Sequence, residues 1–70
     1  MIVYYIPDLI KNSGKSYRTL ADEIGLAYAT IAKLANAKNQ NDYDVSAYAL
    51  DKLCRFFKCK VGDVLKYRRK

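Results

Sequence analysis

The chain is 70 residues long, 51% of its residues are hydrophobic, and its formal net charge is +6 at pH 7. This length allows one domain with a single core, and the hydrophobic fraction excludes an intrinsically disordered chain. Two cysteines and no histidine exclude a disulfide-dense scaffold and argue against a zinc site, because structural zinc needs about four ligands.

The N-terminal segment predicts a short strand followed by a short helix. Residues 2–6 are β-branched or aromatic, which favours extended structure. Pro7 restricts Ile6 to extended geometry and suits the first turn of a helix. A helix is therefore expected over residues 7–13, with Gly14 as its left-handed stop. Two of its side chains should face the core, Leu9 and Ile10.

Two longer helices are predicted on either side of Gly25. Ser16 is a suitable N-cap for the first, because its hydroxyl accepts a hydrogen bond from an amide two or three residues on. Gly25 ends this helix, and the second is expected over residues 28–37. The apolar positions that should face the core are Leu20, Ala21, Ile24, Ile31 and Leu34.

The next segment predicts a loop and two more helices. Residues 36–44 are rich in turn formers and are expected to form the loop. Either Ser46 or Asp44 is expected to cap a fourth helix. Its inward face should carry Ala47, Leu50, Leu53, Cys54 and Phe57. After a turn at residues 58–60, a fifth, short helix is expected to begin at Val61. It should contribute Val64 and Leu65 to the core.

The basic C-terminal tail is expected to pair with the N-terminal strand. A lone strand is not stable in water, so residues 66–70 and 2–5 each need a partner. The sequence leaves open whether they pair within one chain or between two. Residues 36–70 carry nine basic and four acidic side chains, against four and three in residues 1–35. This excess favours a polyanionic partner, although a solvated surface with a basic tail has the same composition.

Residues 17–37 form the most informative stretch, because their pattern predicts a helix-turn-helix. Two helices that meet at roughly 90–120° across a short turn need a small residue where they cross. They also need a residue that tolerates positive φ at the turn. Ala21 meets the first demand, and Gly25, four positions later, meets the second. The side chains expected to fill the angle between the helices are Leu20, Ile24, Leu26, Ile31 and Leu34.

With this motif, the chain resembles the Cro and lambda-repressor-like helix-turn-helix family, also called the xenobiotic-response-element family. Leu53-Cys54, Cys59 and the segment Val61-Gly-Asp-Val-Leu65 are similar to the second half of its short members, so the resemblance covers nearly the whole chain. It implies an all-α fold of five helices in a single domain over residues 1–70. It also implies binding to operator DNA, often as a dimer.

Two positions depart from the pattern of this family. Tyr17 stands where the family favours glutamine, which weakens the implied phosphate contact at this position. After the recognition helix the family has Glu-Asn-Gly-Lys, of which Asn36 and Lys38 are matched. Ala37 replaces the glycine, so this helix is expected to run on or to stop differently.

The second helix of such a motif lies in the major groove of DNA, with its N-terminal residues facing base edges. The residues expected to contact bases are Ala27, Tyr28, Ala29, Ala32 and Lys33. Lys33 is suited to guanine, whose O6 and N7 are acceptors in that groove. Phosphate contacts are expected from helix N-termini and the following loop, namely Ser16, Tyr17, Arg18, Thr30, Asn36, Lys38 and Asn39.

Structural alternatives exist for several of these residues. Arg18 has the spacing to pair with Asp22 on the surface of one helix. Asn36 can serve as a helix C-cap, and Tyr28 can be a surface aromatic without a ligand. Cys54 is expected to be a small core residue. Tyr4, Tyr5 and Tyr67 lie near the chain ends, where either a dimer interface or the monomer would bury them.

These patterns predict a sequence-specific transcriptional regulator, a repressor that binds double-stranded operator DNA as a homodimer. The expected location is the cytoplasm, in a prokaryotic nucleoid or a phage-infected cell. No enzymatic activity, cofactor, metal or small-molecule substrate is expected, since the chain has neither histidine nor a glycine-rich phosphate loop. No membrane segment or signal peptide is expected, because Pro7 and Asp8 end the first apolar run well short of roughly 20 residues.

The alternative function is a protein-interaction module on the same fold, antitoxin-like or an adaptor. The predicted recognition helix is rich in alanine, and the chain has seven tyrosines. A small, apolar helix face can dock a protein as readily as DNA. The two functions differ in their response to salt, because phosphate contacts make DNA binding strongly salt-dependent.

Overall fold

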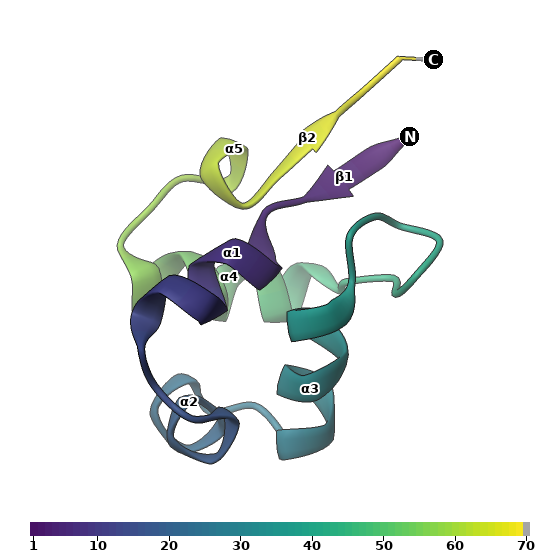
Figure 1. Ribbon diagram of the computed structural model, residues 1–70. Coiled ribbons are helices and arrows are strands. Elements are labelled where there is room, and N and C mark those ends of the chain that lie inside the picture. Colours follow the sequence, from purple (N-terminus) through teal and green to yellow (C-terminus); the bar gives the residue numbers. More distant parts are fainter. Residues whose placement is uncertain (70) are drawn as a thin grey trace.

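The computed structural model describes residues 1–69, which fold into five helices and a two-stranded sheet (Figure 1). The elements in chain order are β1 (Ile2–Tyr4), α1 (Ile6–Ser13), α2 (Tyr17–Ile24), α3 (Tyr28–Asn36), α4 (Ala47–Phe57), α5 (Val61–Val64) and β2 (Leu65–Tyr67). The expected five-helix bundle, with an N-terminal strand paired to the tail, is therefore confirmed. Within the described residues, no helix has both the length and the apolar character needed to cross a bilayer.

The two chain ends pair with each other inside one molecule. β1 and β2 are antiparallel, with Ile2 opposite Tyr67 and Tyr4 opposite Leu65. The pairing thus begins at Leu65, one residue before the expected tail. The question that the sequence left open is answered, because the partner strand comes from the same chain.

The first helix begins one residue earlier than predicted. Ile6, expected to be extended, is the first residue of α1 and is fully buried, and Pro7 follows it. Proline is tolerated there because the amides of a first turn have no partner within the helix. Burying the Ile6 side chain outweighs the preference of a pre-proline residue for extended geometry. Gly14 ends the helix with φ of 70°, as predicted.

Serine side chains cap α2 and α4 at their N-termini. The Ser16 hydroxyl accepts a hydrogen bond from the Thr19 amide at 3.2 Å, which confirms the predicted cap of α2. The Ser46 hydroxyl accepts from the Ala49 amide at 3.1 Å. Ser46, and not Asp44, is therefore the cap of α4.

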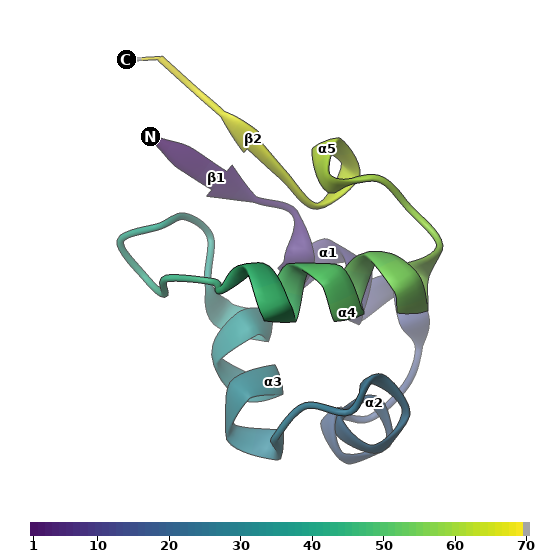
Figure 2. The same ribbon diagram turned by 180° about the vertical axis from the view of Figure 1, so that it is seen from behind.

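The core lies where the helices meet, and α4 crosses the side of the bundle that faces the viewer in Figure 2. Its fully buried side chains are Ile6, Leu20, Ile31, Leu34, Leu53 and Val64. One predicted core position is wrong, because Ala47 is exposed and Ala49 is buried in its place. The start of α4 is rotated so that Ala49, one helical turn before Leu53, faces inward. Leu50, Cys54 and Phe57 pack against the core as half-buried residues.

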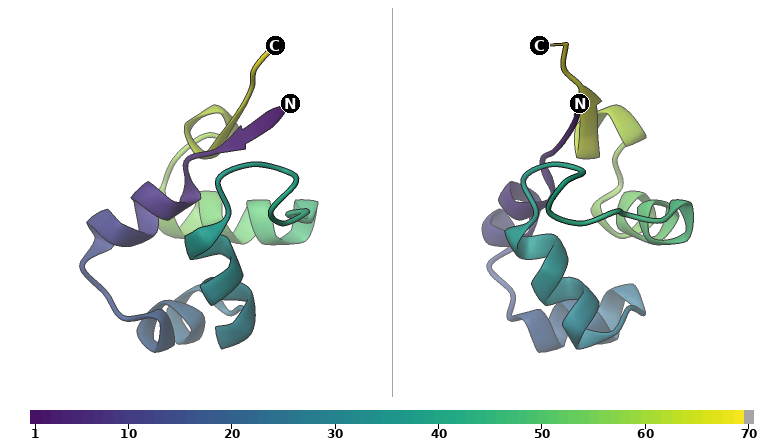
Figure 3. Two further views of the ribbon diagram at one scale, coloured as in Figure 1. Left: turned by 45° about the vertical axis from the view of Figure 1, so that its right-hand side comes forward. Right: turned by 90° about the vertical axis from the view of Figure 1, so that its right-hand side faces the viewer.

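The recognition helix ends at Asn36, one residue earlier than predicted, and the chain continues in an extended conformation. Ala37 has φ of −87° and ψ of 115° and is only 1% exposed. Because this conformation is open to any residue, the missing glycine is not needed. The following loop runs beside β1 (Figure 3), where Tyr4 N donates to Lys38 O at 2.9 Å and Val3 forms a bridge with Asn39.

The molecule is elongated, with principal extents of 36 × 22 × 22 Å. The paired strands project from one end, which also carries both chain ends (Figure 1). α2 and the first turn of α3 lie at the opposite end (Figures 1 and 3). The helix-turn-helix is therefore presented at an outer tip of the molecule, away from the sheet.

Candidate nucleic-acid interface

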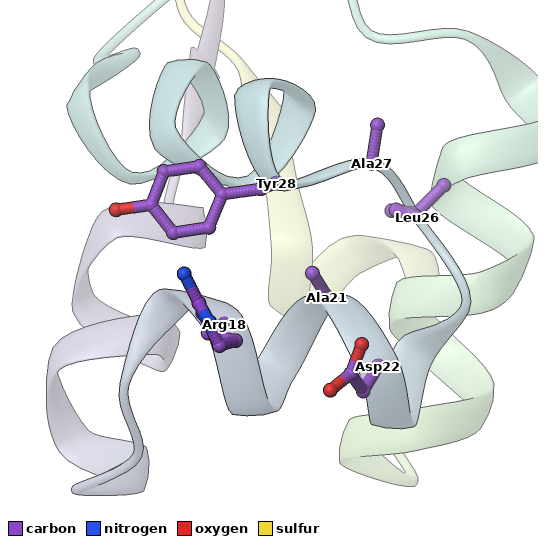
Figure 4. A pocket seen from close by; sticks show the side chains of 6 residues that line it. All are labelled: Arg18, Ala21, Asp22, Leu26, Ala27 and Tyr28. Carbon is purple, nitrogen blue, oxygen red and sulfur yellow. The ribbon is translucent and has the colours of Figure 1, made fainter.

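The turn between α2 and α3 is built around Gly25. This residue has φ of 85°, a left-handed conformation that side chains with a Cβ rarely adopt. Its amide and that of Leu26 both donate to the Ala21 carbonyl, at 2.9 and 3.1 Å. Ala21 is buried and lies in the angle between the helices (Figure 4). The small residue and the glycine thus occupy the places that the sequence pattern assigned to them.

The outer side of α3 is exposed, and the inner side belongs to the core. Ile31 and Leu34 have no exposed surface. Tyr28 is 55% exposed. Of the other residues predicted to contact bases, three are exposed, Ala27, Ala29 and Lys33, and one is half-buried, Ala32. Ala32 is less exposed than expected, and it lines a depression together with Lys33, Asn36, Ala37 and Asp42.

The N-terminal residues of α2 and α3 lie side by side. The rings of Tyr17 and Tyr28, the first residues of the two helices, have centroids 6.2 Å apart and are tilted by 57°. Figure 4 shows Arg18 pointing toward the Tyr28 ring rather than toward Asp22, its expected surface partner. Between the two helices lies a depression. It is lined by Arg18, Ala21, Asp22, Leu26, Ala27 and Tyr28.

The two adjacent helix N-termini are suited to an anion. Ala27, the N-cap of α3, has no side-chain acceptor, so no side chain within the described residues caps the first amides of this helix. Such amides, together with the helix dipole, attract a negatively charged group. At α2 the Ser16 hydroxyl is engaged in the cap and also donates to the Thr19 hydroxyl at 2.9 Å. Arg18 and Tyr28 line the depression beside these amides.

The remaining residues predicted to contact phosphates are arranged differently. Thr30 is half-buried in the first turns of α3. The Asn36 side-chain amide donates to the Ala32 carbonyl at 2.8 Å, within its own helix. Lys38 is exposed, and its backbone amide donates to Asp42 at 2.8 Å. Asn39 is half-buried and bridged to β1, so it lies with the sheet rather than with the helix N-termini.

Charge is distributed unevenly along the long axis. Lys66, Arg68 and Arg69 are exposed on β2 and just beyond it, at the end opposite the α2–α3 turn (Figure 1). At the turn end, Lys15 and Glu23 neutralise each other in an ion pair of 2.5 Å. The basic excess found in the sequence is therefore centred away from the outer side of α3, where Lys33 supplies the charge.

One contact near this surface was not predicted from the sequence. Tyr43, in the loop after α3, lies beneath Lys33, whose Nζ is 5.8 Å from the ring centroid. The ring packs partly against the core. The sequence carries no periodic signal for this contact, because Tyr43 belongs to an irregular loop whose path depends on the pairing with β1.

The two cysteines are reduced and lie together at the end of α4. The Cys59 amide donates to the Cys54 carbonyl at 3.1 Å across the left-handed residue Lys58. Burial raises the pKa of the Cys59 thiol, and the neighbouring Cys54 and the charge of Asp63 raise it further. A thiol with a raised pKa is a poor nucleophile at neutral pH. Among residues 1–69, no group of three or more metal-binding side chains is present.

The fold and this surface together define a class of protein, the helix-turn-helix DNA-binding domains. Residues 6–70 match the family model of the Cro/C1-type HTH DNA-binding domain. The chain therefore belongs to this family, as its resemblance implied. No curated protein matches the chain.

Proposed function

We propose that this protein is a sequence-specific transcriptional repressor that inserts the outer side of α3 into the major groove of operator DNA. The observation that carries the proposal is the exposure of that side at a tip of the molecule. Ala27, Tyr28, Ala29 and Lys33 are all exposed there, next to the N-terminus of α2. Membership of the family supports DNA binding as the kind of activity. Recognition of a specific operator and repression of transcription are what we propose in addition.

The base contacts would come from a few residues. Lys33 would donate to guanine O6 and N7, Tyr28 would hydrogen-bond a base or a phosphate, and Ala29 would touch a thymine methyl. Ala32, half-buried, would contribute packing against a base edge. Since alanines carry little information, part of the specificity would come from the shape and flexibility of the duplex.

The phosphate contacts would anchor the protein along the backbone. Tyr17, Arg18 and the amides around Ser16 would hold one phosphate at the α2 N-terminus. Thr30, Asn36 and Lys38 would follow the backbone along α3. We leave Asn39 out of this set because its backbone is bridged to β1.

We further propose that residues 1–70 act as one domain in a homodimer on a palindromic operator. A two-fold dimer matches two half-sites roughly 34 Å apart, which is one turn of the duplex. The strongest support is exposed apolar surface near the chain ends, where Tyr67 is 68% and Val61 52% exposed. Tyr4, for which the sequence left a dimer interface and burial in the monomer open, is 7% exposed and belongs to the core of the monomer. Sedimentation equilibrium would measure the oligomeric state.

The test begins with selection of duplexes from a random pool by the purified protein. A single consensus sequence is expected, with two-fold symmetry. Replacing Lys33 by alanine should then relax one position of each half-site and cost about 1–3 kcal/mol of binding free energy. Lys66→Ala is the matched control, because it removes the same charge from β2, which lies at the far end of the molecule (Figure 1). Equal effects of the two variants would refute the assignment of α3 as the recognition helix.

Salt dependence separates this function from the alternative, a protein-interaction module. The exposed alanines and Tyr28 on α3 favour that alternative, since such a surface can pack against another protein. For DNA, the logarithm of the affinity should fall by roughly 0.9 per phosphate contact for each tenfold rise in salt. No consensus from the pool, together with a salt-insensitive protein ligand, would favour the interaction module.

A further inference from the structure

The single charged side chain of the recognition helix is held from outside that helix. Among the residues of α3, Tyr28–Asn36, Lys33 alone is charged. Its ammonium lies 5.8 Å from the centroid of the Tyr43 ring, within the range of a cation–π interaction. Lys33 also lines the depression that includes Asn36 and Asp42. Its side chain is thus drawn toward the C-terminal half of α3.

Tyr43 is itself fixed by the core of the protein. The hydroxyl of Tyr4, which is 7% exposed, donates to the Tyr43 carbonyl at 2.8 Å. The same hydroxyl accepts a hydrogen bond from the Val45 amide at 3.3 Å. Earlier in the loop, the Gln40 amide donates to the Ile2 carbonyl at 2.9 Å. The backbone of the loop is therefore hydrogen-bonded to β1 and to Tyr4 on both sides of Tyr43, and the Tyr43 ring packs against the core.

A fixed support matters because lysine is otherwise a poor reader of sequence. Its long stem carries rotatable bonds that let the ammonium reach many acceptors, and ordering it on binding costs entropy. A ring beneath the ammonium restricts the positions that it samples before DNA arrives. Preorganisation of this kind improves discrimination between bases by penalising contacts outside that restricted region.

We propose that Tyr43 is a positioning residue for DNA recognition, which holds Lys33 over its ring and thereby determines the base pair that Lys33 reads. This inference rests on the proposed function of α3. Two contacts connect β1 to the recognition helix in this role. Tyr4 of β1 holds the loop at the Tyr43 carbonyl, and the Tyr43 ring holds the ammonium of Lys33, the one cation of α3.

The first test uses the protein without DNA. In the NMR spectrum, ring current from Tyr43 should move the ε-methylene protons of Lys33 upfield of those of Lys11, an exposed lysine on α1. Tyr43→Leu should abolish this shift and Tyr43→Phe should keep it. The inference would be overturned if, in the wild-type protein, the chemical shifts of Lys33 were like those of Lys11. This comparison is made within the wild-type protein, so it does not depend on whether a variant folds.

The second test measures discrimination on the selected duplex. The quantity is the dissociation constant for a duplex changed at the base pair that Lys33→Ala relaxes, divided by the dissociation constant for the consensus duplex. Tyr43→Leu should lower this ratio about two- to fivefold, the size of an exposed cation–π contact. Tyr43→Phe should leave it unchanged. In the Lys33→Ala background, Tyr43→Leu should have no further effect, which a merely structural role would not produce.

Tyr48→Leu provides the matched control. Tyr48 is also a tyrosine beside a lysine, since Lys52 Nζ is 4.9 Å from its ring centroid, but both residues lie on α4. This variant should keep the full ratio. An unchanged ratio in Tyr43→Leu, or an equal fall in both backgrounds, would overturn the inference while leaving the role of α3 intact. If the wild-type protein selects no consensus, the proposed function fails and the inference fails with it.

Discussion

The turn at Gly25 allows a prediction whose sign can be worked out from the backbone. Gly25 has φ of 85°, and an added Cβ would lie 3.1 Å from Lys52 Nζ. Because that atom is the end of a flexible side chain, crowding costs little and backbone strain decides the outcome. A left-handed conformation costs an L-residue about 1–2 kcal/mol. Gly25→Ala should therefore lower the free energy of unfolding by about this amount.

Gly62 and Gly14 supply the controls for this prediction. Gly62 lies in α5 without a positive φ, and its Cβ would meet nothing within 4 Å. Gly62→Ala should therefore stabilise the protein by about 0.4–1 kcal/mol, through the unfolded chain. Gly14 has φ of 70° and equally open surroundings. Gly14→Ala should destabilise about as much as Gly25→Ala, if strain rather than crowding is the cause.

Thermal unfolding followed by circular dichroism would measure all three variants. For a domain of this size, about 1 kcal/mol corresponds to a shift of about 4–8 °C in Tm. Gly25→Ala should thus melt well over 5 °C below Gly62→Ala. The reasoning would be refuted if Gly25→Ala melted at or above Gly62→Ala. A loss confined to Gly25→Ala, with Gly14→Ala unaffected, would mean that contact with the Lys52 side chain and not backbone strain is responsible.

Two substitutions and one alkylation experiment test other parts of the structure. Ser16→Ala removes the side-chain acceptor that caps α2 and should cost about 1 kcal/mol in urea unfolding. Tyr4→Phe leaves the Tyr43 carbonyl without its donor and should cost about 1–3 kcal/mol in the same assay. Because desolvation, with smaller effects of Cys54 and Asp63, raises the pKa of Cys59, its alkylation by iodoacetamide should follow a titration above that of the unfolded chain. Stability linked to this thiol should be complete below the unfolded pKa and lost as the pH rises through the folded one.

Features set by local chemistry could be predicted from the sequence. The cap at Ser16 depends on one hydroxyl and a nearby amide, and the turn at Gly25 depends on the absence of a Cβ. The buried pair Ile31 and Leu34 follows from helical periodicity. For the candidate interface, the same periodicity separated the outer side of α3 from the inner side, although Ala32 proved half-buried.

Features that depend on distant segments could not be predicted. Ile6 is helical because the rest of the core buries it, against the local effect of Pro7. Ala47 and Ala49 differ in burial although both are alanines, and so small a side chain gives a weak periodic signal. The contact between Tyr43 and Lys33 arises because β1 fixes the loop, a pairing that no local pattern encodes.

The central claim is that the outer side of α3 and the start of α2 meet DNA. NMR titration of the labelled protein with its selected duplex tests this residue by residue. Amide resonances should change most at residues 16–18 and 27–33, and little in β1 and β2. Changes confined to the paired strands or to α4, with residues 27–33 unaffected, would contradict the account.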